Sequence, residues 1–106
     1  MEQQPNSSSP ARPASEETIY HRHRDASFTR FGGEGLLVVP KSAMQIVLND
    51  TGARVFELLG EGDSSAKSLA ERLAREYESP DAGQVRREVL EVLEELRSQG
   101  AVEIVG

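Results

Sequence analysis

The segment MQIVLNDTGARVFELL, residues 44–59, constrains the fold most, because the spacing of its apolar side chains changes in the middle. Up to Leu48 apolar and other residues alternate, which places Met44, Ile46 and Leu48 on one face of a strand. After Asn49 the small and apolar residues recur at helical spacing. Only Asn49 and Asp50 separate the two patterns, and either side chain can cap a helix. The segment therefore predicts a strand that leads directly into a helix.

Two further strands are expected before this junction. Residues 27–31 (SFTRF) alternate, and residues 36–39 (LLVV) form a short apolar run that is typical of a central strand. The GGEG cluster between them favours a turn, because glycine accepts positive φ angles. Short connections predict that these two strands and residues 44–48 form a three-stranded antiparallel meander.

Three helices are expected after the meander. The first carries Gly52, Val55, Phe56 and Leu59 on one face, and GEGD at residues 60–63 ends it. The second begins after Ser64 or Ser65 and runs to Tyr77. The third spans residues 81–99 and ends at Gly100, and residues 101–105 then form a short strand or extended tail. The order predicts an α+β, winged-helix-like domain in which a three-stranded antiparallel sheet precedes three helices.

Composition limits the domain boundaries and the partners. Residues 1–18 are rich in Ser, Pro and Gln, so we expect a disordered tail followed by one domain at residues 19–106. The chain has no Cys, which fits a cytoplasmic protein, and no apolar run approaches a membrane span. Residues 50–106 carry the whole net charge of −6. This acidity disfavours nucleic acid and anionic membrane as partners.

No pattern of residues indicates catalysis. His21 and His23 would share a face of a strand, but no Cys or motif-placed carboxylate completes a metal site, so solvated side chains are the better interpretation. The glycine-rich FGGEG lacks the Lys-Ser/Thr ending of a phosphate-binding loop, and no G-x-S-x-G is present. We therefore expect a protein that is not an enzyme and binds no cofactor or metal.

The third predicted helix carries two neighbouring stripes. At about 100° per residue, Val85, Val89, Val92 and Leu96 form the expected core stripe, with Leu93 at its edge. A second stripe beside it consists of Arg86, Leu90, Leu93 and Arg97. This stripe could line a groove for an apolar peptide segment, with the Arg side chains holding its acidic groups. Alternatively, Leu90 widens the core stripe and the Arg residues pair with nearby Glu residues.

The strand at residues 44–48 raises a matching question. As the last strand of a meander it would be a sheet edge, whose free N–H and C=O groups another chain can use. It contains no charged residue and no Pro that would discourage such pairing. Either a partner strand binds there, or the chain covers the edge with its own tail or terminal strand.

The sequence resembles the coenzyme PQQ synthesis protein D (PqqD-like) family across roughly residues 27–105. The resemblance rests on the order and spacing of LNDTGARVFELLGEG, SLAERLAREY and VRREVLEVLEELRSQGAV. It implies a RiPP recognition element, a small domain that binds the leader of a ribosomally made precursor peptide. The leader would add as a strand beside residues 44–48 and pack against the third helix. The domain would then present the peptide to a modifying enzyme, which is a radical S-adenosylmethionine protein in the PQQ branch.

Carried onto this chain, the resemblance implies a set of peptide-binding residues on the edge strand and the long helix: Met44, Gln45, Ile46, Val47, Leu48, Val85, Arg86, Val89, Leu90, Leu93 and Arg97. Two other functions compete with this hypothesis. A winged-helix DNA-binding regulator would need a basic recognition helix, whereas the long helix here is acidic. A small structural subunit would form a homodimer through the same edge strand.

Overall fold

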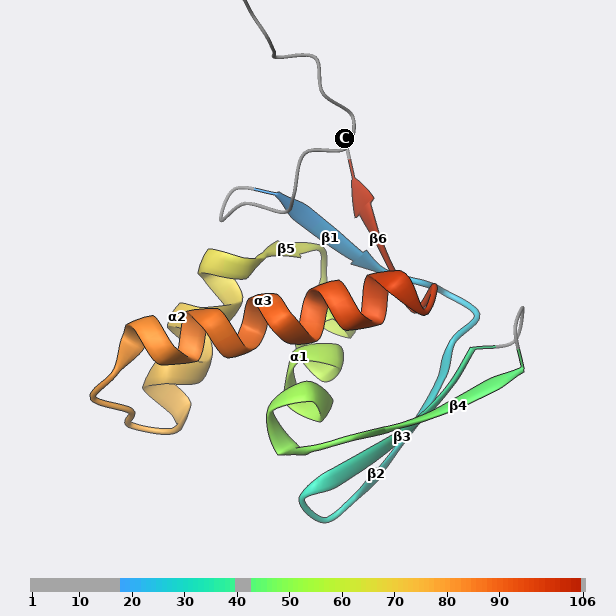
Figure 1. The fold of residues 1–106 in the computed structure, drawn as a ribbon, viewed down its shortest axis with the longest axis horizontal. Coiled ribbons are helices and arrows are strands. Elements are labelled where there is room, and N and C mark those ends of the chain that lie inside the picture. The colour runs from blue at the N-terminus through green and yellow to red at the C-terminus, as the bar shows by residue number, and fades with distance from the viewer. Residues whose placement is uncertain (1–17, 40–42, 106) are drawn as a thin grey trace, which may run out of the picture.

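The computed structural model describes residues 18–39 and 43–105, and it has the predicted α+β architecture (Figure 1). The predicted tail at residues 1–18 lies, except for Thr18, outside the described residues, so the domain boundary stays a prediction. The elements in chain order are β1 (Ile19–Arg22), β2 (Ser27–Phe31), β3 (Glu34–Val39), β4 (Met44–Leu48), α1 (Asp50–Glu61), β5 (Ser64–Ser65), α2 (Ala66–Glu76), α3 (Ala82–Ser98) and β6 (Val102–Val105).

The predicted meander is present as the antiparallel sheet β2-β3-β4. Gly32 and Gly33 connect β2 to β3, and Gly32 has a φ of +56°, which explains why the turn uses glycine. Gly35 has a different reason, since a Cβ there would lie 2.5 Å from Cε1 of Phe28. The side chain of Phe28 therefore packs directly over the backbone of β3.

Local capping signals set the three helices. Asn49 Oδ1 accepts a hydrogen bond from the Gly52 N–H at 2.9 Å, so Asn49 rather than Asp50 caps α1. Ser65 and Asp81 cap α2 and α3 in the same way. At the other end of α3, Gly100 adopts a φ of +85°, and the Ala101 N–H donates to the Leu96 carbonyl. These bonds end the helix at the place that the sequence predicts.

A second antiparallel sheet has the order β5-β1-β6. The terminal segment is therefore a paired strand and not an extended tail: β6 pairs with β1, with Tyr20 opposite Ile104. The two-residue strand β5 completes the sheet on the other side of β1. No repeating pattern of apolar residues in the sequence predicts this pairing. The strand β5 is too short to show one, and apolar and polar residues do not alternate in β1. Figure 1 shows this sheet above α3 and the meander below it.

The core lies where α1 meets α3, α2 and both sheets. Six residues of α1 are buried, and Val55 and Phe56 have no exposed surface. Tyr20 from β1 and Leu37 from β3 close the core from opposite sides. The described residues include no buried polar or charged residue. None of the helices described here has the length and apolar character needed to cross a membrane.

Candidate functional site

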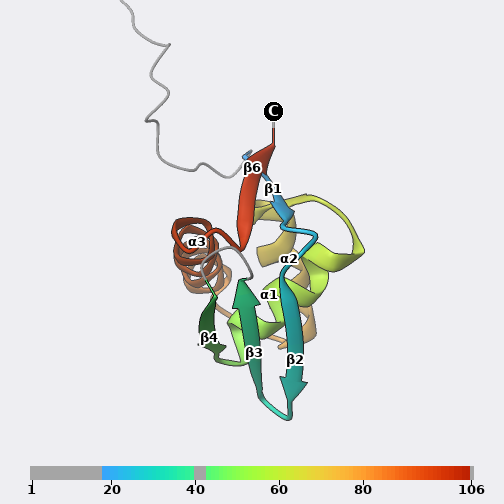
Figure 2. The same ribbon diagram turned by 90° about the vertical axis from the view of Figure 1, so that its right-hand side faces the viewer.

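The strand β4 forms one edge of its sheet, as the sequence predicts. Within the described residues it pairs with β3 alone, with Ile46 opposite Leu37 and Leu48 opposite Gly35. Figure 2 shows it as the outermost strand, beneath α3. Leu48 is buried, whereas Val47 on the other face is 70% exposed. An apolar residue this exposed on an uncharged edge strand is typical of a surface for pairing with another chain.

A groove of about 430 Å³ separates β4 from α3. Its walls come from the end of β4, the start of α1 and one flank of α3. Val92 on the helix side and Val47 on the strand side supply its accessible apolar surface, and the buried side chains of Leu96 and Leu48 lie behind them. The lining residues are Val47, Leu48, Asn49, Gly52, Glu91, Val92, Glu95 and Leu96.

The helix residues that the sequence analysis assigned to peptide binding lie elsewhere. Val85 is 7% exposed, and Val89 and Leu93 are completely buried in the core, so a surface-bound peptide has no access to them. Leu90 is half-buried and packs against the same core. It lies roughly 160° around the helix from Val92, which faces the groove. The alternative interpretation, in which Leu90 widens the core stripe, describes this helix better.

The two Arg residues also lie on the flank of α3 away from the groove. Arg97 forms an ion pair with Glu94 at 2.8 Å, and Glu94 accepts a hydrogen bond from the Tyr20 hydroxyl of β1 at 3.1 Å. Arg86 lies one helical turn before Leu90 and is half-buried. The groove therefore borders the opposite flank of the helix from these two residues, and the peptide-contact face of α3 stays a prediction.

The core direction assumed from the sequence differs from the observed one by a small angle about the axis of α3. Taking Val85, Val89, Val92 and Leu96 as the core stripe pointed the core direction too close to Val92. Weighting all six Val and Leu residues of the helix, including Leu90 and Leu93, moves that direction close to Val89. With that correction Val92 falls at the margin of the core, beside Glu91 and Glu95.

Burial and pairing shift the titration of the residues on the flank away from the groove. Burial raises the pKa of Tyr20 to about 12, and the neighbouring Glu94 carboxylate contributes to this rise. The hydrogen bond from Arg97 lowers the pKa of Glu94, with a smaller contribution from the Tyr20 hydroxyl. The hydrogen bond and the ion pair among these three side chains therefore connect α3 to β1.

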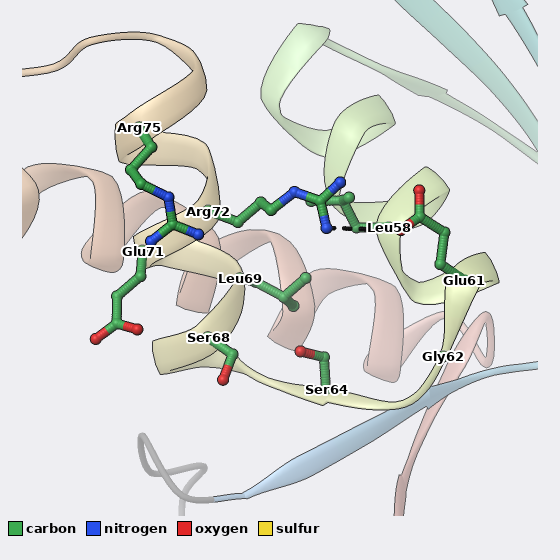
Figure 3. Close-up of a pocket in the computed structure, with 9 residues that line it drawn as sticks. All are labelled: Leu58, Glu61, Gly62, Ser64, Ser68, Leu69, Glu71, Arg72 and Arg75. Atoms are coloured by element: carbon green, nitrogen blue, oxygen red, sulfur yellow. Dashed lines mark ion pairs between the residues drawn. The ribbon is translucent and has the colours of Figure 1, made fainter.

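A second hollow of about 390 Å³ lies between the end of α1 and α2 (Figure 3). Its lining includes side chains of both charges, the acidic Glu61 and Glu71 and the basic Arg72 and Arg75. Arg72 contacts Glu61 at 3.6 Å, the pair drawn with a dashed line, and Glu76 at 3.2 Å. Because polar side chains dominate this hollow and β4 does not border it, it does not suit an added apolar strand.

The histidines have neighbours of their own. His21 Nδ1 lies 2.7 Å from a carboxylate oxygen of Asp63, and His23 Nδ1 accepts a hydrogen bond from the Asp25 N–H. In the part of the chain that the structure describes, no group of three or more metal-binding side chains is present.

The fold and groove define a class of protein: a small α+β domain whose exposed strand edge faces a helix across an apolar groove. The chain belongs to the family of coenzyme PQQ synthesis protein D (PqqD), whose family model matches residues 34–102. This finding confirms the resemblance seen in the sequence. A comparison with curated proteins found no match.

Two solved structures share the fold. One is TbiB1 in complex with the TbiA(beta) leader peptide, with 22% identity, a TM-score of 0.69 and coverage of 78% of this chain and 94% of that chain. The other is the solution NMR structure of the PqqD truncation of Methylobacterium extorquens PqqCD, described as a functional and stand-alone RiPP recognition element. Its identity is 18% and its TM-score 0.71, and the match covers 85% of this chain and 94% of that chain.

Proposed function

We propose that this protein is a non-catalytic adaptor that binds the leader segment of a ribosomally synthesised precursor peptide and presents it to a modifying enzyme. The observation that carries the proposal is the edge of β4, which no strand of the described residues covers, beside the groove under α3. Membership of the PqqD family supports it. The structural relative solved with a leader peptide supports it as well.

In this proposal the leader binds as a strand beside β4. Main-chain hydrogen bonds from Met44, Gln45, Ile46, Val47 and Leu48 would provide affinity that does not depend on leader sequence. Side chains of the leader that face α3 would contact Val92, the half-buried apolar residue of the helix wall. Selectivity would then come from the helix, because the contacts made by side chains distinguish one leader from another.

Membership of the family supports a modifying enzyme as the second partner. We assign this chain no chemistry of its own, and the modifying enzyme, a radical S-adenosylmethionine protein in the PQQ branch, would carry out the reaction. The encounter would take place in the cytoplasm, where ribosomes release the precursor. PQQ itself or a related peptide product would be the end of the pathway.

An NMR titration tests the proposal. Isotope-labelled full-length protein is mixed with synthetic peptides that tile each short open reading frame encoded beside its gene. We expect one peptide to shift the amide signals of β4 and of residues 91–96 together, with little change in β1 and β6. Shifts confined to the hollow between α1 and α2, or no shifts with any peptide, would contradict strand addition.

Self-association through β4 is the competing use of the same edge, because Val47 exposes 70% of its surface there. Sedimentation over a hundredfold range of protein concentration separates the two. A monomer throughout agrees with an adaptor whose edge is free for a leader. A dimer that the peptide cannot dissociate would favour the structural subunit.

A further inference from the structure

The wall of the groove formed by α3 is acidic. Glu91 and Glu95 both line the groove and are exposed to solvent. Glu88 lies about one helical turn earlier, close to the same flank. Gln99 donates a hydrogen bond to Glu95 at 3.0 Å, but among residues 18–39 and 43–105 no basic side chain forms an ion pair with Glu88, Glu91 or Glu95. No described ion pair therefore holds these carboxylates, and the nearest basic residue on this flank of the helix is Arg87, one turn before Glu91.

Some carboxylates outside the groove have cationic partners, whereas others, such as Glu71 and Glu103, form no ion pair among the described residues. Glu76 binds the guanidinium of Arg54 at 2.8 Å, Asp50 binds Arg30 at 3.0 Å, and Glu94 binds Arg97 at 2.8 Å. Across the groove, β4 carries no charged residue. The groove thus combines an apolar floor with one negatively charged wall, whereas these carboxylates outside it have cationic partners.

We infer that the peptide segment held in this groove is basic, with an apolar side chain that contacts Val92 and Lys or Arg residues that pair with Glu91 and Glu95. The inference rests on the proposed function, because it names the class of leader that the site takes. It reverses the sign expected from the sequence, where Arg86 and Arg97 predicted an acidic leader. The structure places those two residues on the other flank of α3.

The geometry of the wall also predicts the spacing of the basic residues. Figure 1 shows β4 and α3 running broadly side by side in opposite directions, so a strand added to β4 would lie along the helix. Glu91 and Glu95 are four residues apart, which is a rise of about 6 Å along a helix. Residues i and i+2 of a strand are about 6.8 Å apart. Two basic side chains separated by one residue therefore match the two carboxylates.

Selection from a random-peptide display library tests the inference and does not require the leader to be identified first. Immobilised full-length protein is used to enrich random peptides at low salt, and the enriched peptides are sequenced. We expect net-basic peptides with Lys or Arg at i and i+2 and an apolar residue at i−2 or i+4, since these positions share one face of a strand. Because exposed charge pairs are screened, their binding should weaken about threefold to tenfold at high salt.

Two double variants test whether the attraction of basic peptides arises at the groove wall. Glu91→Gln/Glu95→Gln neutralises the groove wall, and Glu71→Gln/Glu103→Gln removes the same amount of charge from exposed positions outside the groove. We expect the first to weaken basic peptides about threefold to tenfold and the second to leave their affinity within about twofold. Equal weakening by both variants would mean that only the overall acidity of the protein attracts the peptides, which would overturn the inference.

The remaining outcomes separate this inference from the proposed function. Neutral or acidic peptides that are lost with Val92→Asp would keep the groove as the binding site but overturn the basic specificity. Enriched peptides that ignore both Val92→Asp and the groove double variant would overturn the binding site and the specificity together. Failure to enrich any peptide would contradict the proposed function itself.

Discussion

The two flanks of α3 contain similar residues but have opposite surroundings. On one flank Glu94 is held by Arg97 and by the Tyr20 hydroxyl, and Leu90 packs against the core. On the other flank Glu91 and Glu95 border an open groove beside the edge of β4. The comparison shows that similar residues on the two flanks of one helix differ in their access to a partner. The elements packed beside each flank decide which residues remain available to a partner.

The largest expected effect concerns Leu93, which lies on the core-facing side of α3. Leu93→Ala should lower the free energy of unfolding by about 2–5 kcal/mol, because it leaves a cavity among completely buried side chains. Urea unfolding followed by circular dichroism measures this change. Leu90→Ala is the matched control and should cost less, since Leu90 is only half-buried. Equal costs would mean that the core direction of α3 is not the one described.

A matched pair of charge insertions tests which flank binds the peptide. Val92→Asp and Leu90→Asp each place a carboxylate at a half-buried apolar position, but only Val92 lines the groove. We expect Val92→Asp to weaken a peptide selected for the groove by an order of magnitude or more, which is about 1.4 kcal/mol for each factor of ten. Leu90→Asp should leave the affinity nearly unchanged. Fluorescence anisotropy with the same labelled peptide compares the two, after circular dichroism has established that both variants are folded.

The opposite result, in which Leu90→Asp abolishes binding and Val92→Asp does not, would restore the contact face that the sequence analysis predicted.

The group formed by Tyr20, Glu94 and Arg97, on the flank of α3 away from the groove, predicts a change of stability with pH. The pKa of Tyr20 is raised from 10.0 to about 12, so the folded state favours the protonated phenol. This stabilisation is complete below about pH 10 and is lost as the pH rises towards about 12, because the unfolded state loses the proton first. Tyr20→Phe removes the hydrogen bond to Glu94 and should cost about 0.5–1.5 kcal/mol at neutral pH.

Chemical unfolding at neutral pH and at two alkaline pH values between the two pKa values measures both parts of that prediction. The difference between the wild type and Tyr20→Phe should narrow as the pH rises. A difference that stays constant over this range would contradict the role given to the buried phenol.

The smallest expected effect is at Arg97. Arg97→Gln removes the ion pair with Glu94 but leaves the groove intact, so peptide affinity should not change beyond experimental error. Isothermal titration of the same peptide at low salt measures it. A clear loss of affinity for acidic peptides in particular would show that the paired flank also takes part in binding.

Much of the fold could be predicted because its signals are local. The change of apolar spacing at residues 44–59 marked the junction of β4 and α1, and the caps at Asn49, Ser65 and Asp81 lie within the same few residues as the helices that they begin. The edge position of β4 followed from the short connections of the meander. The pairing of β1 with β6 could not be predicted, because it joins segments near opposite ends of the domain without a shared pattern.

The sequence by itself determined the meander, the three helices, the family and the edge strand, because each depends on neighbouring residues or on a pattern along the chain, whereas it did not predict β1 or β5. Only the tertiary structure decided which flank of α3 faces that strand. Successive helix residues are about 100° apart, so a rotation much smaller than one residue moves Val92 to the surface and Leu93 into the core. The packing of α2, α1 and β6 against one side of α3 fixes this rotation, and it leaves the acidic side open towards β4.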